Sequence, residues 1–179
     1  MGKMKATLLE YGQEVTTIML RKPVVKILRK HYLAIDPGQK GGLCVVSFDG
    51  IPLEWSRMPA GTPRIIDWIS IANGKYANLV MVTEKSQAMP KQGIVGAFSY
   101  GAHFGIFETV AIMLQIPYHE VRPMIWKKAL GLTSSKLDSI TVCRRLFPKL
   151  ELIPDGCRIP HDGIAEALLI SQWARQKNL

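Results

Sequence analysis

Short apolar runs alternate with turn residues in the first half of the chain. Residues 31–35 and 43–48 are rich in apolar and β-branched side chains, and the DPGQKGG segment between them is typical of a turn. Asp49 and Gly50 then lead into a third run over residues 51–57. This spacing predicts three antiparallel strands joined by hairpins.

The remaining pattern alternates between helix and strand periodicity. Thr62 and Pro63 suit the start of a helix, and the LVMVT run at 79–83 is typical of a strand buried on both faces of a parallel sheet. We expect helices over 62–74, 93–115, 123–130, 136–147 and 162–176, and strands over 79–83 and 117–121. The order predicts an α/β fold with a mixed five-stranded sheet, three antiparallel strands followed by parallel strands, flanked by helices.

Charge divides the chain into two parts. Its 179 residues suit one domain, and +5 of the net charge of +9 lies in residues 1–30. We therefore expect residues 1–30 to be a basic N-terminal extension and residues 31–179 to form the domain. Whether the extension is structural or is an arm that touches a partner stays open. The basic surplus favours polyanionic partners, either nucleic acid or a membrane surface.

The cysteines and the hydropathy of the chain indicate its cellular compartment. Cys44, Cys143 and Cys157 are widely spaced and form no metal-binding motif, which favours a reducing compartment and a cytoplasmic location. The apolar stretch over residues 93–116 is long enough to cross a bilayer, but His103 and Glu108 interrupt it. We expect a buried helix there and no membrane partner.

Four carboxylates fall at the ends of predicted elements. Asp36 ends the first strand, Glu84 ends the parallel strand, and Asp162 and Glu166 share one face of the last helix. If that helix crosses the sheet beside the two strands, all four side chains converge, and their mutual repulsion is relieved by divalent cations. Two metal ions held by carboxylates can activate a water and stabilise a leaving oxygen in phosphodiester hydrolysis.

Each of these acids also has an ordinary structural interpretation. Asp36 suits a turn, Asp162 suits a helix N-cap, and Glu166 suits an exposed helical position. Glu84 is harder to explain by packing, because it directly follows an apolar strand. The coincidence of acids on three separate elements favours a functional site, which we predict to be catalytic and metal-binding.

Three segments carry a resemblance to a known family. The sequences AIDPGQKGGLCVV, VMVTEKSQ and HDGIAEALLISQW, in this order, resemble the RuvC-like Holliday junction resolvases, most closely their bacteriophage-type branch. This family lies within the RNase H-like and retroviral-integrase superfamily, and the resemblance covers about residues 31–176. It implies an RNase H-like fold and a homodimeric, Mg²⁺-dependent endodeoxyribonuclease, with Mn²⁺ as an alternative ion. Such an enzyme nicks a four-way DNA junction in pairs and leaves 5′-phosphates.

The resemblance also assigns roles by position. Asp36 corresponds to the first-strand metal ligand and Glu84 to the second invariant acid. Glu166 matches the acid inside the last helix, and Asp162 matches a position that relatives fill with Asp or His. These two acids are four residues apart here and usually three apart in the bacterial enzymes, so the closer ligand of the two stays open. His161 is an alternative for a base-like role, or an ordinary loop residue.

Basic and small residues suggest how DNA and a second subunit would bind. Positive side chains follow the parallel strand, on loops and helices where a solvated face is the alternative explanation. The predicted DNA contacts are Lys85, Lys91, Arg122, Lys127, Lys128, Lys136, Arg144 and Arg145. Small residues recur every four positions on the long helix, at Gly93, Ala97, Gly101 and Gly105. We predict that this stripe forms the homodimer contact, or else lies on the sheet.

Other functions share parts of this pattern. An RNase H-like nuclease acting on RNA–DNA hybrids or branched replication intermediates would have the same metal chemistry. A non-catalytic nucleic-acid-binding module would be favoured if the acids did not converge. An actin-like or sugar-kinase-like ATPase fits the glycines after Asp36, but the chain is short for that class and shows no second phosphate loop.

Overall fold

The computed structural model describes residues 6–10, 13–17, 29–85, 93–133 and 135–179. A five-stranded sheet forms its centre, with the strand order β5-β4-β3-β6-β7. The strands are β3 (His31–Asp36), β4 (Gly42–Ser47), β5 (Pro52–Arg57), β6 (Leu79–Glu84) and β7 (Tyr118–Val121). β3, β4 and β5 pair antiparallel, whereas β6 pairs parallel with both β3 and β7. The predicted mixed α/β sheet is therefore confirmed.

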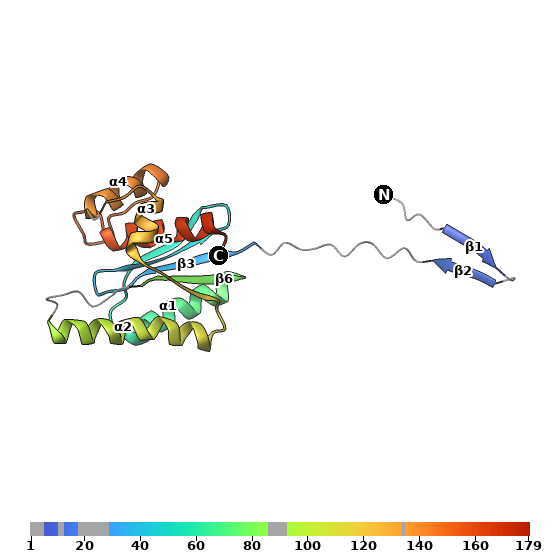
Figure 1. The fold of residues 1–179 in the computed structure, drawn as a ribbon, viewed down its shortest axis with the longest axis horizontal. Coiled ribbons are helices and arrows are strands. Elements are labelled where there is room, and N and C mark those ends of the chain that lie inside the picture. Colours follow the sequence, from blue (N-terminus) through green and yellow to red (C-terminus); the bar gives the residue numbers. More distant parts are fainter. Residues whose placement is uncertain (1–5, 11–12, 18–28, 86–92, 134) are drawn as a thin grey trace.

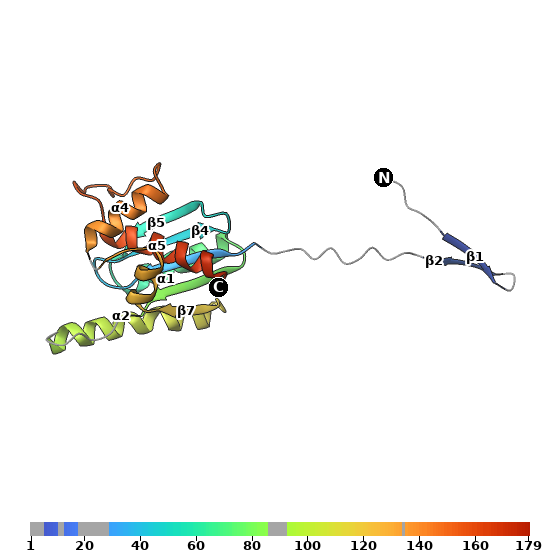
Figure 2. The same ribbon diagram turned by 45° about the horizontal axis from the view of Figure 1, so that its top comes forward.

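Helices cover both faces of this sheet. The helices are α1 (Thr62–Lys75), α2 (Ile94–Met113), α3 (Pro123–Ala129), α4 (Lys136–Leu146) and α5 (Asp162–Lys177). Figures 1 and 2 show α1 and α2 on one face and α3, α4 and α5 on the other. Pro63 and Pro123 lie in the first turns of α1 and α3, where the missing N–H costs no helical hydrogen bond.

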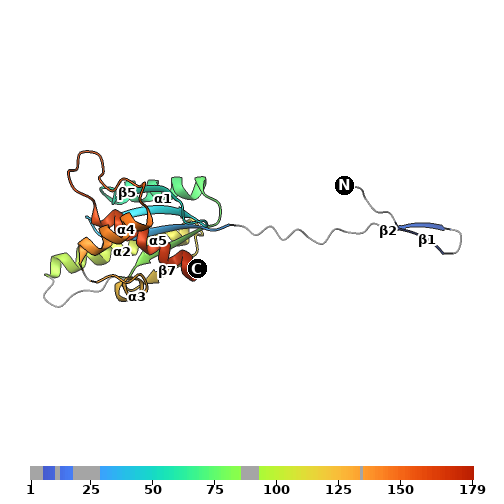
Figure 3. The ribbon, with the colours of Figure 1, turned by 90° about the horizontal axis from the view of Figure 1, so that it is seen from above.

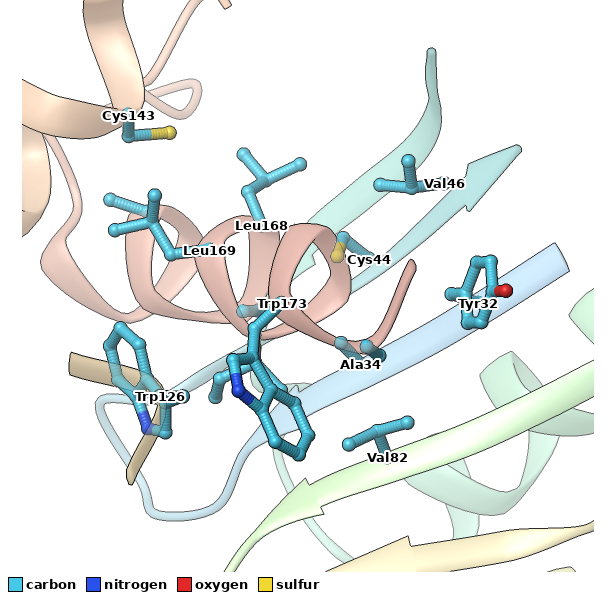
Figure 4. Packing of buried hydrophobic residues seen from close by; sticks show 14 of the residues in the cluster. Tyr32, Ala34, Cys44, Val46, Val82, Trp126, Cys143, Leu168, Leu169 and Trp173 are labelled. Carbon is cyan, nitrogen blue, oxygen red and sulfur yellow. The ribbon is translucent and has the colours of Figure 1, made fainter. Parts of the chain in front are cut away.

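Alternation along the central strands produces two cores. On β3, Tyr32 and Ala34 face α5, and Leu33 and Ile35 face α1 and α2. All four are fully buried, because helices exclude water from both faces. Figure 4 shows the core around α5, where Trp173 extends toward the strands and Leu168 and Leu169 extend toward the side of Cys143. The free thiols of Cys44 and Cys143 are also buried in this core.

The N-terminal segment contains structure that the hydrophobic pattern did not predict. β1 (Ala6–Glu10) and β2 (Gln13–Thr17) pair antiparallel as a two-stranded hairpin. The apolar run at 24–28 lies outside the described residues, so the expectation of a strand or helix there is not addressed. The chain enters the domain at Arg29, which pairs with Asp49 at 3.1 Å, and at Lys30, whose Nζ donates to the Leu179 main-chain O at 2.6 Å.

The long apolar stretch forms α2, which buries only part of its surface. Phe107, Val110 and Ala111 lie in the core beneath the sheet, whereas Ile112 and Met113 are exposed. The first half of the helix extends beyond the sheet (Figures 1 and 3). Among the residues described above, no helix is both long and apolar enough to cross a membrane.

Three glycines bring the start of α5 against the end of the β3–β4 hairpin. Gly41 forms an isolated parallel bridge with Gly163, and Figure 3 shows α5 lying over the sheet. A Cβ on Gly42 would lie 2.7 Å from the carbonyl oxygen of Gly163, and a Cβ on Gly163 would lie 2.7 Å from the Cα of Gly41. Because no side chain fits between these backbones, glycine is required on both sides of the contact.

We expect Gly163→Ala to lower the free energy of unfolding by about 1–3 kcal/mol, the usual cost of forcing an extra carbon into a filled space. Urea unfolding followed by circular dichroism measures this. Gly74→Ala is the matched control, because a Cβ there meets no atom within 4 Å. That change should stabilise α1 by about 0.5–1 kcal/mol. Equal stability of Gly163→Ala and the native chain would contradict the close contact.

Candidate active site

Two of the predicted acids lie side by side at one edge of the sheet. Asp36 is the last residue of β3 and Glu84 is the last residue of β6. The strands are parallel, and Ile35 pairs with Thr83, so the two acids follow at the same level. The carboxyl ends of parallel strands form the edge where α/β sheets commonly bind ligands.

The other two acids reach the same edge from α5. Asp162 is the first residue of the helix and Glu166 lies one turn further on. The glycine contact fixes this end of α5, since Gly42 pairs with Asp36 and lies against Gly163, the neighbour of Asp162. The N-cap of α5 is His161, whose Nδ1 accepts a hydrogen bond from the backbone N–H of Ile164 at 3.3 Å. The ordinary interpretation of Asp162 as an N-cap was therefore wrong.

The electrostatics of Asp36 reflect the convergence of all four acids. Burial raises the pKa of Asp36 well above its ordinary value, and the negative charges of Glu166, Glu84 and Asp162 raise it further. The Lys127 ammonium acts in the opposite direction. Ionised Asp36 is therefore unfavourable here, because water is excluded and like charges surround it.

Glu84 is held by a tryptophan. Trp126 on α3 is fully buried, and its Nε1–H donates to Glu84 Oε2 at 2.8 Å. Burial raises the pKa of Glu84, and this hydrogen bond partly offsets the effect. Trp126 is therefore more than a core residue, because its indole N–H fixes the orientation of a candidate ligand.

Glu166 is held by a lysine and a serine. Lys127 Nζ lies 2.8 Å from Glu166 Oε1, and Ser139 Oγ donates to the same oxygen at 2.9 Å. The side chains of Lys127 and Glu166 are only 19% and 13% exposed. Lys127, predicted as a DNA contact, therefore supplies an internal positive charge to the acid cluster.

The four acids suit a hard divalent cation in their chemistry. Carboxylate oxygens are the ligands that Mg²⁺ and Mn²⁺ prefer, and burial together with three neighbouring acids raises the pKa of Asp36. Within the described part of the chain, no three His, Cys, Asp or Glu side chains are arranged closely enough to hold a metal ion. Glu84 and Glu166 are instead hydrogen-bonded to Trp126, Lys127 and Ser139.

Several predicted DNA contacts have exposed side chains. Arg122 and Lys128 are exposed on and beside α3, and Arg144 and Arg145 are exposed in the last turn of α4. Lys85 follows Glu84 and pairs with Glu120 at 2.6 Å. Lys136 opens α4, though its side chain is not described, and Lys91 lies outside the described residues.

The small-residue stripe of α2 does not lie on the sheet. Gly93, Gly101 and Gly105 are exposed, and a Cβ at each would meet no atom within 4 Å. The side chain of Ala97 is not described. Of the two predicted roles for the stripe, contact with the sheet is therefore wrong at these three positions.

Comparison with known proteins identifies the fold. No protein-family model matches the chain, and no curated protein sequence does. Among solved structures, the chain is similar to Thermus thermophilus RuvC with a TM-score of 0.54 and 18% identity. T. thermophilus RuvC in complex with a Holliday junction substrate matches with the same score and 16% identity. Each match covers 83% of this chain and 96% of the other.

The chain has a RuvC-like, RNase H-like fold. The predicted fold class is confirmed at this level. Asp36 lies on β3, Glu84 on β6, and Asp162 and Glu166 on α5. These are the elements to which the RuvC-like resemblance assigned the four acids.

We expect Asp36→Asn to stabilise the protein at pH 7 in EDTA. The raised pKa means that the native state binds this proton more tightly than the unfolded state, so stability falls as pH rises from the unfolded value of 3.8 through the raised one. Asparagine does not ionise, so the variant keeps this stability as pH rises. A gain of 1 kcal/mol shifts Tm by about 2–4 °C in a domain of this size.

Calorimetry between pH 3 and pH 8 provides the measurement. The difference in Tm should be largest near neutral pH and should vanish at about pH 3, where Asp36 is protonated in both states. A variant less stable than the native chain at pH 7 in EDTA would contradict the electrostatic account.

Proposed function

We propose that this protein is a structure-selective DNA endonuclease that resolves four-way junctions by metal-dependent phosphodiester hydrolysis. The observation that supports this most is the half-buried Asp36, whose pKa the nearby charges of Glu84, Asp162 and Glu166 raise, at the carboxyl edge of a RuvC-like sheet. Such a cluster is costly to fold unless a cation compensates it. The site therefore favours a reaction that uses divalent metal.

In this proposal, Asp36, Glu84, Asp162 and Glu166 are the catalytic residues and hold Mg²⁺ or Mn²⁺. The bound metal would supply a nucleophilic water at neutral pH and charge stabilisation for the leaving oxygen. The protein's own groups prepare this site. Trp126 orients Glu84 through its indole N–H, and Lys127 offsets the charge of Glu166. The indole N–H does not titrate, so it remains a hydrogen-bond donor to Glu84 as pH changes.

The proposed substrate is branched DNA, bound in the cytoplasm by a homodimer. The chain has a net charge of +9, and exposed Arg122, Lys128, Arg144 and Arg145 are available for phosphate contacts. The T. thermophilus RuvC structure that matches this fold was solved with a Holliday junction substrate. We assign the dimer contact to the exposed glycine face of α2. A two-fold dimer presents one site to each of two opposed strands.

We expect the native chain with Mg²⁺ to make paired, symmetric nicks in a labelled synthetic four-way junction. Linear duplex, flap and RNA–DNA hybrid substrates should stay intact, and EDTA should abolish cleavage. Glu84→Gln should lower kcat by about 10³-fold or more while junction binding persists, because it removes a proposed ligand without altering the DNA-binding surface.

Asp49→Asn is the matched control, since Asp49 is exposed in the β4–β5 turn, at the end of β3 opposite to Asp36. This variant should cleave at the native rate. Cleavage of hybrids or of all branched substrates would transfer the protein to a broader class of RNase H-like nuclease. Absence of cleavage with intact binding would leave a non-catalytic DNA-binding protein.

We expect Gly101→Leu to shift the protein from dimer to monomer and to weaken junction binding, because the leucine side chain would separate two closely approaching helices. Analytical ultracentrifugation measures the change. Gly74→Leu places the same side chain in open space on α1 and should leave the dimer intact. A full dimer in Gly101→Leu would place the contact elsewhere.

A further inference from the structure

A cavity lies on the side of α3 away from the core. Its volume is about 600 Å³, within the usual range for small-molecule sites. Pro123, Met124, Lys127, Lys128, Leu132 and Thr133 line it, on α3 and on the loop that leads to α4. Three apolar residues and two lysines thus line the cavity, and none of the lining residues is acidic.

Residues 131–133 line part of this cavity, and hydrogen bonds hold them in place. The N–H of Leu132 donates to the Lys127 carbonyl at 2.9 Å, and that of Gly131 donates to the Lys128 carbonyl at 3.2 Å. The N–H of Thr133 donates to Asp138 Oδ2 at 3.2 Å, which ties the loop to α4. The loop that lines the cavity is therefore held to α3 and α4 by hydrogen bonds.

One side chain joins the cavity to the acid cluster. Lys127 lines the cavity, and its Nζ lies 2.8 Å from Glu166 Oε1. Its neighbour Trp126 is bonded to Glu84 on the core side of the same helix. A group bound in the cavity would therefore lie one lysine side chain away from the carboxylates.

The apolar residues and lysines that line the cavity favour a ligand with an apolar part and a negatively charged group. A nucleotide satisfies both requirements, because its base can lie against Met124 and Leu132 while its phosphate meets the exposed Lys128. Met124 is 75% exposed, which leaves its side chain accessible to such a base. At the crossover of a four-way junction, stacking is interrupted between arms, so the cost of withdrawing a base is low.

We propose that this cavity binds one unstacked nucleobase beside the scissile phosphate and so determines where the junction is cut. This inference rests on the proposed function for its substrate. It adds a site that selects the cleavage position through Met124 and Leu132, separate from the acids that carry the chemistry.

The test uses junctions that carry 2-aminopurine at successive positions around the crossover. Binding of the native chain in EDTA should raise fluorescence at one position near the cut, because the probe leaves its stack. Met124→Ala should reduce that rise by at least half. Met113→Ala is the matched control, since Met113 is 76% exposed at the end of α2 and should give the native signal.

Cleavage of abasic junctions provides the second readout. Removing the base at the same position should lower kcat/KM about ten-fold in the native chain, the usual effect of losing apolar contact in a pocket. In Met124→Ala the same abasic substitution should cost clearly less, because the contact is already lost. Met113→Ala should show the native penalty.

The outcomes separate this inference from the proposed function. Junction cleavage with a fluorescence rise at no position, or with equal rises and equal abasic penalties in native and Met124→Ala, would overturn the nucleobase site alone. A fluorescence rise that depends on Met124, without any cleavage, would support the site and overturn the nuclease function. Failure to bind junctions would overturn both.

Discussion

Repulsion among four half-buried carboxylates is the constraint on which the candidate site depends. A folded chain normally avoids this arrangement, because each ionised acid raises the cost of ionising the others. Here the fold enforces it through two parallel strands that end at the same level and a helix fixed against the β3–β4 hairpin. The stability lost at Asp36 is the physical reason to expect a cation.

Neighbouring groups relieve part of this repulsion, and the part that remains acts mainly on Asp36. Trp126 on α3 donates to Glu84, and Lys127 on α3 and Ser139 on α4 bind Glu166. Asp36 is different, because burial dominates its pKa and three acids add to it. The helix α3 therefore supports the acids on one side while its other side lines a cavity suited to a nucleotide.

Local patterns predicted the sheet well and its supporting contacts poorly. Alternation and turn residues located β3, β4 and β6, and hence placed Asp36 and Glu84 at strand ends. They could not show that Trp126 reaches Glu84, 42 residues away, because such a contact depends on tertiary packing and side-chain orientation. The β1–β2 hairpin was also missed, although only Tyr11 and Gly12 separate its strands, a spacing typical of a hairpin turn.

The most direct test is a carboxyl-carbon NMR titration of Asp36, with the resonance assigned by its loss in Asp36→Asn. In EDTA, the pKa of Asp36 should lie well above the ordinary value of 3.8. Added Mg²⁺ should lower it, because a bound cation favours the ionised form. An ordinary pKa in EDTA would contradict the convergence of the four acids, and a raised pKa that Mg²⁺ leaves unchanged would contradict a metal site at Asp36.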